Sequence, residues 1–272
     1  MGVGVGEVET EGRLVEAEGR LWDRGTQDWA EFQEAQFQES FEDALGEAGV
    51  GPECKVLDVG CGSGLLLRLA AARGAATAGL DASQGLLDIA RDRLPDGSDL
   101  RVGDLQELPY EDGEFDVLIS FNALRYARDP VAAVRGFGRV VRSGGAVVLG
   151  GWGEPAKCET TAMLFDVLAL LPEPPAGSGG DAANTPTEVR GAVRGAGLPI
   201  VFTKELSCPF VYPDLDTAWA ALGSTGLLQH ASSVVGADTV RAVFDRNFRG
   251  SVRPDGSVVQ NNTCEYAIAR VP

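Results

Sequence analysis

The sequence predicts an α/β fold in which parallel strands and helices alternate around a doubly wound sheet. From residue 55 onward, short apolar runs alternate with stretches of helical periodicity, which is typical of strands joined by crossover helices. The first run ends in a glycine-rich turn at 60–64, and two further strand-like runs lie near the C-terminus. One domain with embellishments is the economical arrangement for a chain of 272 residues.

Residues 1–48 are expected to form an N-terminal helical segment ahead of this fold. They are rich in Glu, Ala and Gln, and their aromatic residues recur at roughly helical intervals. We interpret these aromatics as core-packing residues of one or two amphipathic helices. The aromatics are Trp22, Trp29, Phe32, Phe37 and Phe41.

Residues 49–153 carry the alternation that defines the sheet. The strand-like runs are KVLDV, ATAGLD, LRVGD, FDVLISF and GAVVLGG, and the helical stretches are GLLLRLAAAR, QGLLDIARDRL and PVAAVRGFGRVV. Turn signals such as Asp129-Pro130 separate these elements. This order predicts parallel strands connected by helices.

Residues 154–272 are expected to complete the same domain, with lid or acceptor-binding insertions and C-terminal antiparallel strands. The Pro- and Gly-rich stretch 171–184 predicts a mobile loop or lid segment. Helical material separates two strand-like runs, 200–212 and 258–271, which are predicted to pair as the closing antiparallel strands. The apolar content of the insertions predicts a largely apolar acceptor pocket over the carboxyl edge of the sheet. Its candidate residues are Trp152, Phe165, Trp219, Leu227, Leu228 and Phe244.

A helix is expected directly after the predicted loop. Thr185-Pro186 suits a helix start, because proline is tolerated in the first turn of a helix. Gly195 or Gly197 suits its end, where glycine is favoured. The interval between these signals is long enough for about three turns of helix.

The charge balance bears on the partners of the protein. The 23 basic and 40 acidic side chains give a formal net charge of −17 at pH 7. A charge of this sign repels nucleic-acid phosphates and anionic lipid surfaces over a Debye length. We therefore expect neither nucleic acid nor a membrane as a partner.

Cysteine usage and the N-terminus favour a cytoplasmic location. The five cysteines are widely spaced and include no C-x-x-C pair, so neither a disulfide framework nor a zinc site is expected. Glu7, Glu9 and Glu11 stand where a secretory signal would be apolar. No uncharged apolar stretch of about 18 residues is present to span a bilayer.

The strongest functional signal is the sequence VLDVGCGSG, a strand that runs into a glycine-rich turn and then into a helix. Glycine lets the backbone turn sharply and approach a ligand, and the helix start offers free N–H groups. Gly60, Gly62 and Gly64 give G-x-G-x-G spacing, preceded by an acidic residue, Asp58. Leu65 stands where the dinucleotide fingerprint has a glycine, which makes a nicotinamide dehydrogenase the weakest alternative. The turn instead has the shape of an S-adenosylmethionine loop.

Two acidic residues follow at the ends of the next two strands. Asp81 ends the run ATAGLD, about 20 residues beyond the first glycine, where an acid reaches ribose hydroxyls in a dinucleotide fold. Its other interpretation is an N-cap of the following helix, and the two roles are compatible. Asp104 ends the third strand, where a carboxylate can accept the adenine amino group while Leu105 packs against the ring.

Together these segments resemble the class I S-adenosylmethionine-dependent methyltransferases, in particular the small-molecule, methyltransferase type 11-like branch. The motifs are VLDVGCGSG, GLDAS, GDLQELPYEDGEFDVLIS and RVVRSGGAVVL, in this order within residues 55–151. Agreement among four spaced motifs makes the resemblance specific. It implies a Rossmann-like seven-stranded sheet whose last two strands form an antiparallel hairpin, and S-adenosylmethionine as the cofactor.

The resemblance also implies which residues hold that cofactor. The implied contacts are Asp58, Gly60, Cys61, Gly62, Asp81, Ala82, Asp104 and Leu105. Ser120, Phe121 and Asn122, at the end of the fourth strand, are expected to face its methionine portion. Trp29 is a further candidate, closing over the cofactor from the N-terminal helices.

No metal site is expected and no catalytic base is assigned. After the fourth strand, Arg125 and Tyr126 occupy a segment in which many members of this branch have a histidine. His230 is the one histidine in the chain, which excludes a multi-histidine metal site. It is a candidate base for acceptor deprotonation, although a lone histidine in a helical, apolar setting is more often structural. Methyl transfer from a sulfonium mainly requires in-line positioning and exclusion of water.

The predicted function is methyl transfer to a small-molecule acceptor. A composition typical of high-GC bacterial genomes and the small-molecule resemblance favour a role in secondary metabolism. A second hypothesis is a methyltransferase-fold enzyme that catalyses a cyclisation or rearrangement with bound S-adenosylmethionine, because fold does not fix function. A third is a cofactor-binding regulatory subunit without turnover.

Overall fold

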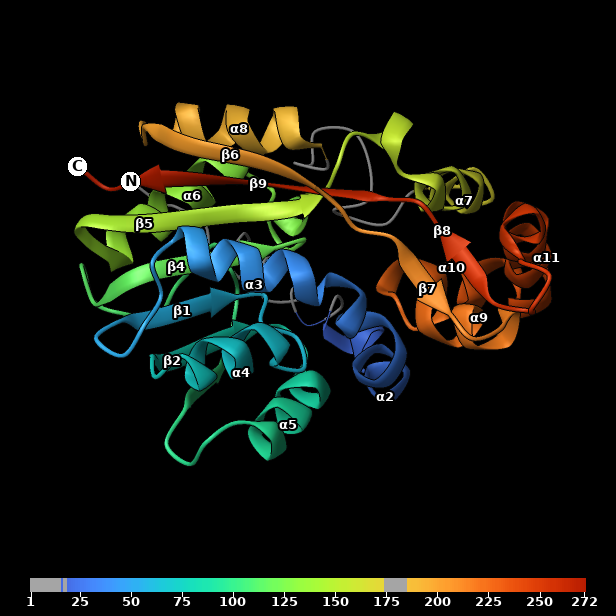
Figure 1. Cartoon of the computed structure of the whole chain (residues 1–272), viewed down its shortest axis with the longest axis horizontal. Coiled ribbons are helices and arrows are strands. Elements are labelled where there is room, and N and C mark those ends of the chain that lie inside the picture. The colour runs from blue at the N-terminus through green and yellow to red at the C-terminus, as the bar shows by residue number, and fades with distance from the viewer. Residues whose placement is uncertain (1–15, 17–18, 174–184) are drawn as a thin grey trace, which may run out of the picture.

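A seven-stranded sheet forms the centre of the protein in a computed structural model that describes residues 16, 19–173 and 185–272 (Figure 1). The strands are β1 (Lys55–Val59), β2 (Ala76–Asp81), β3 (Asp99–Val102), β4 (Phe115–Phe121), β5 (Val141–Trp152), β6 (Ile200–Ser207) and β9 (Thr263–Arg270). Their order is β3-β2-β1-β4-β5-β9-β6, and β9 alone runs antiparallel to its neighbours. The Rossmann-like, doubly wound sheet predicted from the sequence is confirmed.

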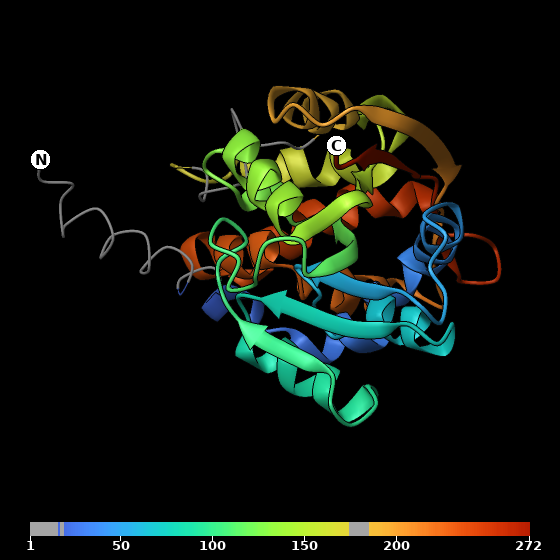
Figure 2. The same cartoon turned by 90° about the vertical axis from the view of Figure 1, so that its left-hand side faces the viewer.

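Helices cover both faces of the sheet (Figure 2). One face carries α3 (Gln38–Glu47), α4 (Leu65–Ala72) and α5 (Gln84–Arg93), and the other carries α6 (Pro130–Val140) and α8 (Pro186–Gly195). The pleat of β1 explains this arrangement, since successive side chains point to opposite faces. Val56 packs into the cluster beneath α3 and α4, whereas Leu57 and Val59 pack beneath α6 and α8.

The remaining C-terminal elements gather beyond the carboxyl ends of β1, β4 and β5, at the right of Figure 1. They are α7 (Glu159–Leu168), α9 (Leu215–Gly223), α10 (Gly226–Val235), α11 (Ala237–Phe248) and a small sheet of β7 (Phe210–Tyr212) and β8 (Val258–Gln260). We call this group the lid. No helix in the described ranges is long and apolar enough to cross a membrane.

The closing antiparallel pair is confirmed over part of its predicted length. The runs 200–212 and 258–271 pair through β6 and β9, but each run is divided. Their ends at 210–212 and 258–260 leave the main sheet and pair with each other. Pro209 lies at the break in the first run, and proline has no N–H to donate to a ladder.

The helix after the predicted loop is confirmed. Thr185 caps α8 in a capping box, in which the Glu188 carboxylate also accepts from Thr185 N at 2.8 Å. Gly197, just past the helix end, has a φ of +82° that favours glycine. Most of the predicted lid loop, residues 174–184, lies outside the described residues.

The N-terminal segment is less regular than the predicted amphipathic helices. Its first 15 residues and residues 17–18 lie outside the described ranges. A short α2 (Thr26–Asp28) leads into a π-helical turn η1 (Trp29–Gln33) and a 3-10 turn η2 (Glu34–Phe37) before α3 begins. Such π-turns recur at functional sites, and this one lies beside the glycine turn.

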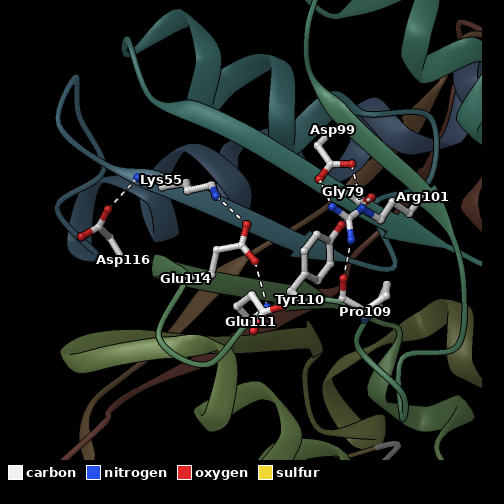
Figure 3. Close-up of polar contacts among 9 residues, drawn as sticks. All are labelled: Lys55, Gly79, Asp99, Arg101, Pro109, Tyr110, Glu111, Glu114 and Asp116. Atoms are coloured by element: carbon white, nitrogen blue, oxygen red, sulfur yellow. Dashed lines mark hydrogen bonds and ion pairs between the residues drawn. The ribbon is translucent and has the colours of Figure 1, made fainter.

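Polar contacts fix the long connection between β3 and β4 (Figure 3). At the amino end of the sheet, Lys55 Nζ pairs with Glu114 at 2.6 Å. The Arg101 guanidinium lies 4.3 Å from the centre of the Tyr110 ring and also bonds Asp99. These contacts hold the part of the connection that leads into β4. Asp104 lies at its other end, just after β3.

Candidate cofactor site

The glycine turn between β1 and α4 has the backbone conformation that its spacing predicts. Gly60, Gly62 and Gly64 have φ values of +81°, +52° and +85°, a region that side chains other than glycine rarely adopt. Gly60 N donates to Leu80 O at 2.7 Å, which holds the turn against the end of β2. A Cβ on Gly60 would lie 2.3 Å from the Ala123 Cβ, so only glycine fits. The turn therefore lies at the switch point between β1 and β4, where ligands bind in doubly wound sheets.

Asp81 lies directly against this turn. One carboxylate oxygen accepts from Gly62 N at 2.8 Å and the other accepts from Ser83 N at 2.9 Å. Burial raises the pKa of Asp81, and these two backbone donors partly offset the rise. The N-cap interpretation of Asp81 is wrong, since Ser83 caps α5 by accepting from Leu86 N. Each Asp81 oxygen keeps a lone pair for an external hydroxyl donor.

Asp58 is a buried carboxyl group at the end of β1. Asp58 is only 3% exposed, and its carboxyl group has no hydrogen-bond partner among the described residues. Burial, together with the nearby Asp81 and Glu34 carboxylates, raises the pKa of Asp58 well above its usual value. Three carboxyl groups thus converge around the turn, an arrangement that favours a cationic ligand.

Glu34, from the N-terminal segment, is a site residue that the sequence did not reveal. Its carboxylate accepts from Leu65 N at 3.2 Å and pairs with Arg93 at 3.0 Å. Gly64 precedes α4 and offers no side-chain cap, so Glu34 satisfies the first N–H of that helix from outside. Burial raises the pKa of Glu34 more than Arg93 and Leu65 N lower it. No local motif pairs Glu34 with α4, because the contact depends on the tertiary path of η2.

Trp29 lies beside Gly62 of the turn. A Cβ built on Gly62 would be 3.6 Å from the Trp29 Nε1 atom. The Trp29 indole N–H is buried without an acceptor, and its ring packs edge-on against Trp22 at 5.0 Å. A buried donor without a partner is costly, so this N–H is available to a ligand held at the turn.

The residues at the end of β4 differ in burial: Ser120 and Phe121 are buried, and Asn122, which follows them, is half-buried. Ser120 Oγ donates to Val59 O at 2.7 Å, and the Phe121 ring packs on Phe41 at 5.1 Å. Their side chains are thus used inside the core, and their backbones pair with β5 in the sheet. Asn122 has a φ of +58°, the one positive value at a non-glycine position in the described ranges. Its side-chain oxygen accepts from Trp152 N at 3.2 Å, and strained residues of this kind cluster at functional sites.

Comparison with known proteins identifies the core. The family model described as "Methyltransferase domain" matches residues 57–149. The chain is 35% identical over 124 residues to the ubiquinone biosynthesis O-methyltransferase of Pseudomonas aeruginosa. That alignment covers 43% of this chain and 53% of the relative, so the chain spans about half the length of the curated relatives it matches. Residues 57–149 thus match the family of methyltransferase domains.

Solved structures share the methyltransferase fold over most of the chain. A methyltransferase solved in complex with the Haloferax volcanii Trm112 activator aligns with a TM-score of 0.60 and 21% identity, covering 92% of this chain and 96% of that one. The cyclase SpnF aligns with a TM-score of 0.56 and 20% identity, covering 86% of this chain and 80% of that one. At these identities the likeness shows the fold alone.

S-adenosylmethionine is the cofactor of this methyltransferase family, and the residues around the turn fit it. Its sulfonium and amino groups are positive, and Asp58 is a buried carboxyl group without a partner. Its ribose has a vicinal diol, and both Asp81 oxygens keep acceptor capacity. Its polar atoms also offer acceptors for the unpaired Trp29 N–H.

The other implied cofactor residues adjoin this group less directly. Cys61 is buried between α4 and α5, where burial raises the pKa of its thiol, and its N–H donates to Leu80 O at 3.1 Å. Ala82 and Leu105 are half-buried. Asp104 is half-buried as well, and it accepts from Gln106 N at 2.8 Å. Only Asp104 therefore adds a side-chain acceptor at this end of the site.

The lid does not form the predicted apolar pocket from all its candidate residues. Leu228 and Phe244 are fully buried in the lid core, while Phe165 is 57% exposed. His230 lies half-buried on α10, which packs against α7, α9 and α11 rather than against the turn. No group of His, Cys, Asp or Glu able to hold a metal ion occurs in the part of the chain that the structure describes.

Proposed function

We propose that this protein is an S-adenosylmethionine-dependent methyltransferase that acts on a small-molecule acceptor. The observation that carries the proposal is the convergence of Asp58, Asp81 and Trp29 on the left-handed glycine turn. These groups offer an unpaired carboxyl group, a diol acceptor and an unpaired N–H donor to one ligand. The matched family and the carboxyl-edge position of the turn support the same ligand.

Bound S-adenosylmethionine supplies a methyl group activated by the positive sulfonium. Asp58 would hold the positive end of the ligand, and Asp81, which accepts from Gly62 N, would also accept from the ribose hydroxyls. Trp29, beside Gly62, and the lid, beyond the carboxyl ends of the strands (Figure 1), would exclude water from a ligand held there. The chain therefore acts mainly by orienting the two reactants, which suffices for an in-line displacement.

Calorimetric titration tests the cofactor. S-adenosylmethionine and S-adenosylhomocysteine are expected to bind the wild type, and NAD is not. Asp81→Ala is expected to weaken both by about tenfold or more, since it removes a charged acceptor. Asp88→Ala is the matched control, because Asp88 is an exposed residue of the neighbouring helix α5. If neither S-adenosylmethionine nor S-adenosylhomocysteine binds the wild type, the proposal is wrong.

Product analysis separates methylation from cyclisation or rearrangement with bound cofactor. Methyl transfer consumes one S-adenosylmethionine per product and releases S-adenosylhomocysteine. Substrate turnover with unchanged cofactor would instead support the cyclisation hypothesis, and the fold shared with a cyclase leaves that reaction class open. Cofactor binding without turnover of any acceptor would support a regulatory subunit.

The proposal extends to the setting of the enzyme. All five cysteines are free thiols, which supports a reducing, cytoplasmic location. The net charge of −17 supports the absence of nucleic-acid and membrane partners. The role in secondary metabolism rests on composition and on the family branch. We likewise propose that residues 1–48 and 154–272 cover the cofactor-binding core 49–153 and select the acceptor.

A further inference from the structure

A hollow lies beside Asn122, at the edge of the candidate cofactor site. It opens between the segment after β4, the end of β5, the start of α8 and the middle of β9. Its polar and charged lining includes Asn122, Arg125, Thr185, Arg190 and Glu265. Because Asn122 belongs both to this hollow and to the candidate cofactor site, the hollow adjoins the place where the acceptor must lie.

The charges that line this hollow do not balance. Arg190 pairs with Glu265, and the two side chains are 23% and 14% exposed. Arg125 has neither a hydrogen-bond nor an ion-pair partner in the described ranges, and its Nε is buried without an acceptor. The centre of the Tyr126 ring lies 5.8 Å from the Arg125 guanidinium carbon. The lining therefore carries one uncompensated positive charge.

An unpaired guanidinium in such a place calls for an anionic ligand. A buried donor without an acceptor is costly, and this chain has ample acidic residues to pair with Arg125. None of those in the described ranges does so. The N-terminus of α8, at Thr185, also lies at this hollow, but the Glu188 carboxylate of its capping box already offsets the positive end of that helix.

The chemistry of the lining selects a monoanion. The planar guanidinium fork matches the two oxygens of a carboxylate. One uncompensated charge is neutralised by one carboxylate, whereas a phosphate dianion would leave excess negative charge next to Glu265. We propose that Arg125 binds a carboxylate group of the acceptor, so that the substrates are small carboxylic acids. This inference rests on the proposed function and names the substrate class of the same site.

A rival ligand for Arg125 is the carboxylate of the cofactor itself. The two are separated by measuring S-adenosylhomocysteine and acids independently. The proteins are the wild type, Arg125→Ala, Arg125→Lys and the control Arg68→Ala, which removes an exposed arginine of α4. Calorimetry first measures S-adenosylhomocysteine binding to each protein. Matched pairs of benzoic acid with benzamide and hexanoic acid with hexanamide, and phenyl phosphate, are then titrated into the loaded proteins.

The wild type and Arg68→Ala are expected to bind at least one acid about tenfold or more tightly than its amide and than phenyl phosphate. Arg125→Ala is expected to lose that preference by 10- to 100-fold, the range for a charge-assisted hydrogen bond of about 1.5–3 kcal/mol. Arg125→Lys is expected to fall between them, because lysine keeps the charge and loses the fork. All four proteins are expected to bind S-adenosylhomocysteine equally.

Three results would overturn the assignment. They are no preference for either acid in the wild type, a preference that survives in Arg125→Ala, and loss of S-adenosylhomocysteine affinity in Arg125→Ala, which would assign Arg125 to the cofactor. If phenyl phosphate binds more tightly than both acids, the monoanion argument is wrong. Failure of the wild type to bind S-adenosylhomocysteine would reject the proposed function instead, so the two failures are distinguishable.

Discussion

Asp58 has an environment that penalises its charged form in the absence of a ligand. Burial, Asp81 and Glu34 hold the pKa of its carboxyl group well above that of an unfolded chain. The folded protein therefore binds a proton that the unfolded chain has already released. The stability that goes with the protonated Asp58 is fully present below the pKa of Asp58 in the unfolded chain. It is lost as the pH rises through the pKa of Asp58 in the folded protein.

Asp58→Asn is accordingly expected to raise the free energy of unfolding of the ligand-free protein at pH 8 and to have little effect near pH 4. The same change is expected to weaken S-adenosylmethionine binding by about tenfold or more, because it removes the charged partner of the ligand. Urea denaturation at the two pH values and calorimetry measure these effects. A variant that is less stable at pH 8 yet binds the cofactor normally would contradict this role.

Asn122 combines backbone strain with a useful side chain. Its φ of +58° costs most residues about 1–2 kcal/mol, whereas glycine adopts it freely. Asn122→Ala is therefore expected to destabilise the protein by about 1–2 kcal/mol in urea denaturation, and Asn122→Gly by less. Both variants lose the acceptor for Trp152 N and are expected to lose methyl transfer to a similar extent. Equal destabilisation by both variants would show that strain at this backbone position is negligible.

Among the elements, the turn η2 caps α4 across the glycine turn through Glu34. Glu34→Ala removes the acceptor of Leu65 N and the partner of Arg93. Breaking a buried ion pair typically costs about 3–5 kcal/mol. Because Arg93 is 30% exposed, we expect about 2 kcal/mol here, together with weaker cofactor binding.

Glu31→Ala supplies the control for this prediction. Glu31 is an exposed residue of η1 in the same segment, so its removal is expected to change stability by no more than about 0.5 kcal/mol. Urea denaturation of both variants measures the difference. If the two variants lose equal stability, the effect belongs to the net charge of the segment and not to the cap.

Elements with strong local signals were predictable from the sequence. The strand-turn-helix unit around Gly60, the helix start at Thr185-Pro186 and the pairing of β6 with β9 follow from periodicity and turn chemistry. The irregular turns η1 and η2 were not, because their path is set by contacts with distant elements. Tyr212, on β7, donates to Gln33 at 2.7 Å, a partner 179 residues away. The role of Glu34 depends on that path and escaped sequence reasoning for the same reason, whereas Trp29 was already a candidate from the sequence.

At the scale of the whole molecule, the N-terminal segment joins the cofactor site to the lid. On one side it reaches the turn through Trp29 and Glu34. On the other side Gln36 exchanges two hydrogen bonds with Val211 of β7. Trp22 packs against Gly226 at the start of α10. A ligand at the turn therefore contacts an element that the lid also holds.

This continuity predicts that cofactor binding stabilises the whole chain in a single transition. S-adenosylhomocysteine at 100 times its dissociation constant is expected to add about 2.7 kcal/mol to the free energy of unfolding. For a chain of this size that corresponds to a rise in Tm of about 5–10 °C, followed by calorimetry and by tryptophan fluorescence. NAD at the same concentration is expected to give no shift.

In Trp29→Phe, which removes the unpaired indole N–H, a tenfold loss of affinity would reduce the added stability by about 1.4 kcal/mol. Separate transitions, with only one moved by the ligand, would show instead that the lid unfolds independently of the cofactor site.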